Sequence, residues 1–80
     1  MVHNRIAFYR GKYGVTQEEL AEEINVTKQY VSKLERENSF PGIKVCFKVL
    51  KALTNITENK SGGIQVANIK LDDLFYDDEL

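Results

Sequence analysis

The polar side chains with the clearest chemical capacity lie together on a short amphipathic stretch, residues 28–36. Its outer side carries ammonium, guanidinium, amide and hydroxyl groups: Lys28, Gln29, Ser32, Lys33 and Arg36. All of these groups donate hydrogen bonds and three are cationic, so they favour the binding of anions and hydrogen-bond acceptors. A solvated helix without any ligand shows the same kind of face. The face alone therefore does not identify a ligand.

Few residues of this chain could support catalysis. His3 is the single histidine, Cys46 is the single cysteine and falls on an apolar helix face, and no acid–base pair accompanies either. We interpret the C-terminal aspartates as helix-dipole and solubility charges, because no other ligand types converge on Asp72, Asp73, Asp77 and Asp78. We therefore predict no enzyme activity, no metal site and no cofactor.

Two helices joined by a tight turn are predicted to position the polar face, within TQEELAEEINVTKQYVSKLE at residues 16–35. Thr16 and Glu19 have the spacing of a capping box, which starts the first helix at Gln17. The apolar residues of this helix recur on one side, at Leu20, Ala21 and Ile24. The pattern is that of a helix-turn-helix.

Three local signals define the turn and the second helix. Asn25 sits where the chain must reverse, and asparagine tolerates the left-handed conformation that such a turn often needs. Thr27 is expected to be the N-cap of the second helix. Val31 and Leu34 then point back towards the first helix, which leaves the polar face outside.

Further helices are predicted on both sides of this pair. Asn4 is expected to cap a helix that reaches about Lys12 and is ended by Gly14, with residues 1–3 frayed. After Pro41, the spacing of IKVCFKVLKAL predicts a helix over residues 43–53, with its apolar side at Ile43, Cys46, Phe47, Leu50 and Leu53.

The segment 54–68 is the least regular part of the chain, and two interpretations remain open. A hairpin turning at residues 61–63 fits the β-branched residues on both sides of SGG. An irregular or disordered loop fits as well, because a two-stranded ribbon alone is marginally stable in water. Residues 69–76, IKLDDLFY, then predict a short last helix, and the tail 76–80 is expected to be mobile.

Length and composition indicate one domain spanning residues 1–80. Hydrophobic residues make up 42% of the chain, and no apolar run approaches the ~20 residues of a membrane span, so we expect a cytosolic protein without membrane contact. The net charge is −1, but residues 1–51 carry nine Lys and Arg against six Glu, whereas residues 52–80 carry two Lys against six Asp and Glu. This division allows a local basic face on a nearly neutral protein.

The chain resembles the XRE-type, phage-repressor-like helix-turn-helix proteins over residues 4–53 and again over 69–76. The family's polar, small, turn and two core positions are matched by Gln17, Ala21, Asn25, Val31 and Leu34. The resemblance implies an all-α, compact five-helix lambda-repressor-like domain with an extended loop or small β-hairpin, the insert 54–68, before the last helix. Lys70 replaces the family's small hydroxyl cap of that helix, with Asn68 as an alternative cap.

The resemblance also implies which residues contact DNA. In the family's geometry the third helix lies in the major groove, and its early outward residues reach base edges. The residues expected to read bases are Lys28, Gln29 and Lys33, because lysine donates to guanine and glutamine pairs with adenine. Contacts to the DNA backbone or base edges are expected from Thr16, Gln17, Thr27, Tyr30, Ser32, Arg36, Asn38 and Ser39.

A structural pair, Arg10 with Glu35, is implied by the same family pattern and would tie the first helix to the end of the third. The alternative is that Arg10 is exposed near the DNA backbone. Two functions remain open for the whole chain. One is a sequence-specific regulator, a repressor that binds a two-fold symmetric double-stranded site as a homodimer. The other is an antitoxin-like or adaptor module that holds a protein partner through residues 54–68.

Overall fold

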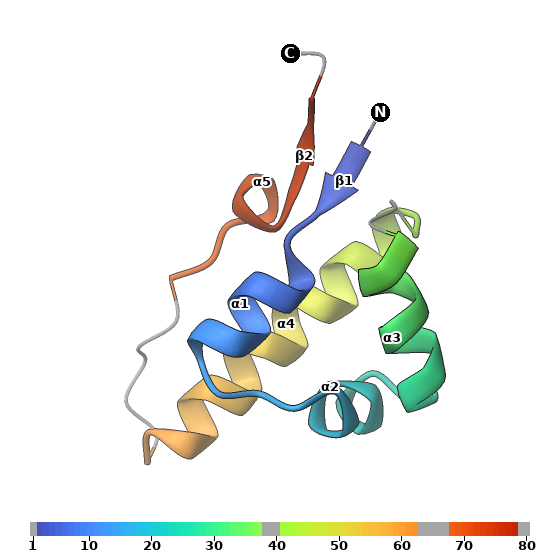
Figure 1. The fold of residues 1–80 in the computed structure, drawn as a ribbon. Helices are drawn as coiled ribbons and strands as arrows, with labels where there is room; N and C mark the ends of the chain where they lie inside the picture. Colours follow the sequence, from blue (N-terminus) through green and yellow to red (C-terminus); the bar gives the residue numbers. More distant parts are fainter. Residues whose placement is uncertain (1, 38–40, 63–67, 79–80) are drawn as a thin grey trace.

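The longest helix of the described residues, α4 (Ile43–Lys60), is the element against which the first, second and last helices pack, whereas the third helix packs against the second (Figure 1). The computed structural model describes residues 2–37, 41–62 and 68–78. In chain order, the other elements are β1 (Val2–Asn4), α1 (Ile6–Lys12), α2 (Gln17–Glu23), α3 (Lys28–Glu37), α5 (Leu71–Leu74) and β2 (Phe75–Asp77). The predicted five-helix, mostly helical class is confirmed for this part of the chain.

The local signals around the turn act as the sequence predicts. The Thr16 hydroxyl accepts from the Glu19 N–H (3.0 Å), and the Glu19 carboxylate accepts from the Thr16 N–H (2.9 Å), which completes a capping box. Asn25 has φ +60°, the left-handed conformation. The Thr27 hydroxyl accepts from the Tyr30 N–H at 3.1 Å. The apolar sides of both helices are buried: Leu20, Ala21, Ile24, Val31 and Leu34.

Residues 2–4 and 75–77 form an antiparallel ribbon, which corrects the prediction of a frayed N-terminus at residues 2–3 and of a mobile tail at residues 76–77; residues 1, 79 and 80 lie outside the described residues. Strands β1 and β2 pair in a register that places His3 opposite Tyr76, and they lie side by side in Figure 1. The Arg5 guanidinium lies 4.0 Å from the centre of the Tyr76 ring. Phe75 is buried, so the ribbon packs on the core and is not an isolated pair of strands.

The first helix begins one residue later than predicted. Arg5, not Asn4, occupies the N-cap position of α1. Asn4 lies in β1, where its side-chain oxygen accepts from the Ile6 N–H (3.3 Å) and its amide donates to the Leu34 carbonyl (3.1 Å). The buried side chain of Asn4 therefore joins the ribbon, α1 and the end of α3.

Helix α4 is longer than predicted, because residues 54–60 continue it instead of forming a loop or a hairpin strand. Burial of Ile56 and Thr57 adds another turn to the core. The Lys60 ammonium then binds the Gly14 carbonyl (2.7 Å) and the Glu19 carboxylate (2.9 Å). The turn of the alternative hairpin at Gly63 and the partner surface at residues 64–67 lie outside the described residues.

The buried side of α4 also differs from the predicted one. Cys46 and Leu53 are fully buried as expected and Leu50 is half-buried, but Ile43 and Phe47 are exposed. Their expected places in the core are taken by residues on the adjacent side of the helix: Val49, Ala52 and Ile56.

The last helix is a single turn, shorter than the predicted span of residues 69–76. Lys70 occupies its N-cap position, and the Asp73 carboxylate accepts from the Lys70 N–H at 3.0 Å, so the alternative cap Asn68 is not used. At Phe75 the backbone becomes extended and enters β2. Strand pairing therefore ends the helix.

Candidate nucleic-acid interface

The outer side of α3 exposes four of the five side chains predicted from the sequence, Lys28, Gln29, Lys33 and Arg36, whereas the fifth, Ser32, is half-buried; Glu37 at the end of the helix is also exposed. The opposite side is buried through Val31 and Leu34. Because helical residues three and four apart share a face, the polar group is continuous along the helix. These polar side chains form a surface of hydrogen-bond donors along the length of α3.

Lys28 makes an ion pair that the sequence reasoning missed. Its ammonium lies 3.0 Å from the Glu18 carboxylate of α2, and the two side chains are 55% and 64% exposed. Exposed pairs of this kind contribute only about 0.2–1 kcal/mol. The pair with Glu18 therefore holds Lys28 only loosely. Another hydrogen-bond acceptor of comparable strength could replace Glu18.

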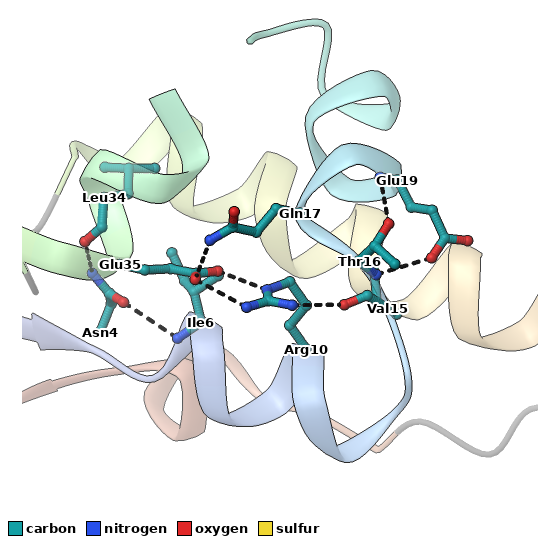
Figure 2. Close-up of polar contacts among 9 residues, drawn as sticks. All are labelled: Asn4, Ile6, Arg10, Val15, Thr16, Gln17, Glu19, Leu34 and Glu35. Carbon is teal, nitrogen blue, oxygen red and sulfur yellow. Dashed lines mark hydrogen bonds and ion pairs between the residues drawn. The ribbon is translucent and has the colours of Figure 1, made fainter. Parts of the chain in front are cut away.

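The position of α3 is fixed by a carboxylate that receives three hydrogen bonds (Figure 2). Arg10 of α1 donates to both oxygens of Glu35, from Nε at 2.8 Å and from Nη2 at 3.1 Å. Gln17 of α2 donates from Nε2 to the same carboxylate at 2.9 Å. Only 9% of the Glu35 side chain is exposed. We call these three side chains, Arg10, Gln17 and Glu35, the Glu35 clamp.

The Glu35 clamp joins three helices, and its arginine also reaches the backbone between α1 and α2. Arg10 Nη1 donates to the Val15 carbonyl at 3.1 Å. Paired guanidinium–carboxylate bonds restrict distance and angle together. The structure thus brings together the pair expected from the resemblance, and Arg10 is not the freely exposed arginine of the alternative.

Gln17 also borders an open hollow. This hollow, of about 640 Å³, is lined by Lys28, by the start of α2, and by the end of α1 with the turn that follows it. The amide has two N–H groups and one carbonyl oxygen, of which a single N–H is used by Glu35. One donor therefore remains for another acceptor. The Gln17–Glu35 contact spans 18 residues, and no local sequence pattern predicts it.

The remaining predicted contact residues have varied surroundings. The hydroxyls of Thr16 and Thr27 are both occupied as helix caps. Tyr30 is half-buried against the core, and Ser32 is half-buried on α3. Asn38 and Ser39 lie outside the described residues. The two threonines and Tyr30 thus have structural roles of their own.

Glu19 of α2 and Cys46 of α4 have shifted pKa values. Hydrogen bonds from Lys60 and from the Thr16 backbone lower the pKa of Glu19, so its carboxylate stays ionised in the capping box. Burial raises the pKa of the Cys46 thiol to about 11. That thiol is inert at neutral pH, because the thiolate is the reactive form.

Within residues 2–37, 41–62 and 68–78, no three His, Cys, Asp or Glu side chains come together as a metal would require. No helix in the same ranges has both the length and the apolarity to cross a membrane.

Comparison with known proteins identifies the class to which this arrangement belongs. The model of the helix-turn-helix family HTH_3 matches residues 6–58, which include α1 to α3 and most of α4. The chain belongs to this family, whose members are of the XRE type.

Relatives are found in archaea and bacteria. An uncharacterized HTH-type transcriptional regulator of Archaeoglobus fulgidus is 32% identical over 79 residues, covering 98% of this chain and 93% of the relative. A second, from Methanocaldococcus jannaschii, is 27% identical over 95% of this chain and 96% of its own length. The regulator YgzD of Bacillus subtilis is 31% identical over 64% of this chain and 77% of its own. No solved structure matches the chain.

Proposed function

We propose that the protein is a DNA-binding transcription regulator, a repressor that binds a two-fold symmetric operator as a homodimer with α3 in the major groove. The observation that carries this proposal is the division of α3 into an exposed donor surface and a side held by the Glu35 clamp. A reading helix needs both features, because its side chains must meet base edges in a fixed register. Membership of the helix-turn-helix family supports the same function.

In the proposed complex, Lys28, Gln29 and Lys33 read bases. Lysine donates to O6 and N7 of guanine, and glutamine makes a paired contact with adenine, each good pair discriminating by about 1–3 kcal/mol. For Lys28 to take part, a base or phosphate acceptor replaces Glu18, which the weakness of that exposed pair allows. Contacts without sequence information come from Gln17 and Arg36, with smaller contributions from Ser32 and the capping threonines.

The direct test is selection of bound duplexes from a random pool, followed by binding titrations. We expect a two-fold consensus with half-sites about one helical turn, ~34 Å, apart. Gln29→Ala should lose preference for the selected duplex over a scrambled one, whereas Gln17→Ala should weaken both alike. A selection without enrichment would refute the proposed function, and equal losses in both variants would refute the assignment of roles.

Glu18→Gln is a further variant, which should strengthen DNA binding and not weaken it. It removes a negative charge beside the groove-facing surface and releases Lys28 from its pair. We expect tighter binding to every duplex and a steeper dependence on salt, since one more cation is available to phosphate. Glu58→Gln is the control, because this carboxylate lies on α4 towards its C-terminal end. Unchanged binding by Glu18→Gln would contradict the placement of Lys28 at the DNA.

A further inference from the structure

Helix α4 has a second apolar side that the fold leaves uncovered. Ile43, Phe47 and Leu50, here called the α4 strip, follow one another at intervals of four and three residues and so share one face, about 10 Å long. Ile43 is 54% exposed and Phe47 is 55% exposed, and Leu50 is half-buried. This is not the core side of the helix, which consists of Cys46, Val49, Ala52, Leu53 and Ile56.

The strip borders a hollow that can receive a side chain. A volume of about 560 Å³ lies between the C-terminal half of the strip and the chain that leads to α5, lined by Phe47, Leu50, Lys51, Thr54, Asn55 and Ile69. Exposed apolar residues that occur singly are common, but a continuous strip beside a hollow marks a contact surface.

Phe8 shows what an isolated exposed residue looks like in the same molecule. It is 62% exposed on α1, and its ring meets Tyr9 of the same helix edge to face, with centroids 5.1 Å apart. Its neighbours one helical turn away are polar or glycine: Asn4, Arg5, Gly11 and Lys12. Along its own helix, Phe8 therefore does not continue into an apolar strip as Phe47 does.

We infer that the α4 strip is the surface through which two copies of this chain associate, with the strip of each copy against the strip of the other. This inference rests on the proposed homodimeric function and supplies its interface. In a two-fold contact each surface must be complementary to itself. The strip meets that condition in its apolar centre, where Phe47 of each copy can enter the hollow of the other.

The charges beside the strip favour a second copy over an unrelated partner. One edge carries lysines on α4, namely Lys44, Lys48 and Lys51. On the other side of the strip, α5 packs against α4, and Asp72 lines a hollow with Cys46; in this segment the carboxylates of Asp72 and Asp73 outnumber the ammonium of Lys70. A two-fold axis parallel to α4 places the lysine edge of each copy opposite the α5 edge of the other. Opposite charges across an interface select the orientation of the partner.

The place of the strip in the chain suits two reading helices. It begins at Ile43, the first residue of α4, and five residues separate Ile43 from Glu37, where α3 ends. A two-fold axis along this strip therefore relates two α3 helices that both end near the same end of the contact. Ile43 and Phe47 together expose apolar area on the order of 200 Å². This area can form the apolar centre of an interface of ordinary size, which buries about 800 Å² per copy.

Sedimentation equilibrium of the full chain, over a concentration series, tests the inference with Phe47→Glu and the matched control Phe8→Glu. We expect a dimer for the wild type and for the control. Phe47→Glu should raise the dimer dissociation constant at least about 30-fold, the effect of losing a central contact. Ile43→Glu is a second variant, in the first helical turn, where a carboxylate favours the helix. Circular dichroism checks that all variants are folded.

Dimers of undiminished affinity in both strip variants would overturn the inference, and so would a wild-type chain that stays monomeric throughout the series. Binding to a duplex with a single half-site separates the inference from the proposed function. A monomeric Phe47→Glu should bind that duplex as well as the wild type does, because α3 is unchanged. If the strip variants dissociate but no variant binds DNA, the interface stands and the proposed function fails.

Discussion

Replacing Arg10 with methionine removes the guanidinium of the Glu35 clamp while keeping most of the apolar length of the side chain. The Glu35 carboxylate then retains one hydrogen bond of its three, from Gln17, and stays 91% buried if nothing moves, since 9% of it is exposed. Breaking a buried pair by removing one partner costs about 3–5 kcal/mol. Arg10 is itself 22% exposed, and one bond to Glu35 remains, so we expect about 3 kcal/mol.

Urea unfolding followed by circular dichroism measures this change. A domain of this size has a total stability of roughly 4–12 kcal/mol, so the loss is a large fraction of it. With a slope of about 1 kcal/mol per molar urea, the midpoint should fall by about 3 M, which leaves a midpoint of only about 1 M if the wild type is at the lower limit.

The double variant Arg10→Met with Glu35→Met distinguishes a pair from two independent contributions. Replacing both partners leaves no buried charge, so its stability should return to within about 1 kcal/mol of the wild type. Losses that simply add would refute the reasoning. A loss below about 1 kcal/mol for Arg10→Met alone would also refute it, because that is the behaviour of a surface pair.

Three other perturbations follow from the structure. Asn25→Ala should cost about 1 kcal/mol in urea unfolding, because alanine pays more for the left-handed conformation, whereas Asn25→Gly should be close to neutral. Because the folded-state pKa of Glu19 is lowered, its stabilising contribution is complete above the ordinary pKa of 4.5 and is lost as the pH falls through the folded value. Glu19→Gln should therefore be less stable than the wild type at neutral pH, and the difference should disappear as the pH falls below the folded-state pKa of Glu19; a constant difference would contradict this cause. Cys46, with its thiol pKa at about 11, should resist a thiol reagent at pH 8 until urea unfolds the chain, and rapid labelling of the native protein would exclude the buried position.

The helix-turn-helix could be predicted because each of its signals is local. The capping box joins two residues that are three positions apart, Thr16 and Glu19. Asn25 and Thr27 likewise determine the backbone only within one helical turn of their own positions. Such patterns act between neighbouring residues, so they can be recognised without knowledge of the rest of the fold. The exposed donors of α3 followed from the same periodicity.

The ribbon could not be predicted from local patterns, because its strands have three residues each and lie more than 70 residues apart. Val2–Asn4 is too short for an alternating pattern to be recognised. The Gln17–Glu35 contact was missed for a similar reason, since it depends on how two helices cross. In both cases the deciding information is tertiary.

The extension of α4 was missed for a different reason. Thr54, Ile56 and Thr57 are β-branched and lower the helical propensity of this segment, which favoured a strand or a loop. Leu53 and Ile56, however, continue the helical spacing of the buried side, and tertiary burial outweighs the small difference in propensity. A longer window of periodicity would have identified this helix.

Helix α3 keeps the side chains that hold it and the side chains that face outward at separate positions. Val31, Leu34 and Glu35 fix the helix, whereas Lys28, Gln29 and Lys33 are exposed. Substitutions at exposed positions usually change stability by no more than about 0.5 kcal/mol. The outward surface can therefore diverge between descendants of one ancestor, or be rewritten in the laboratory, while the scaffold stays the same.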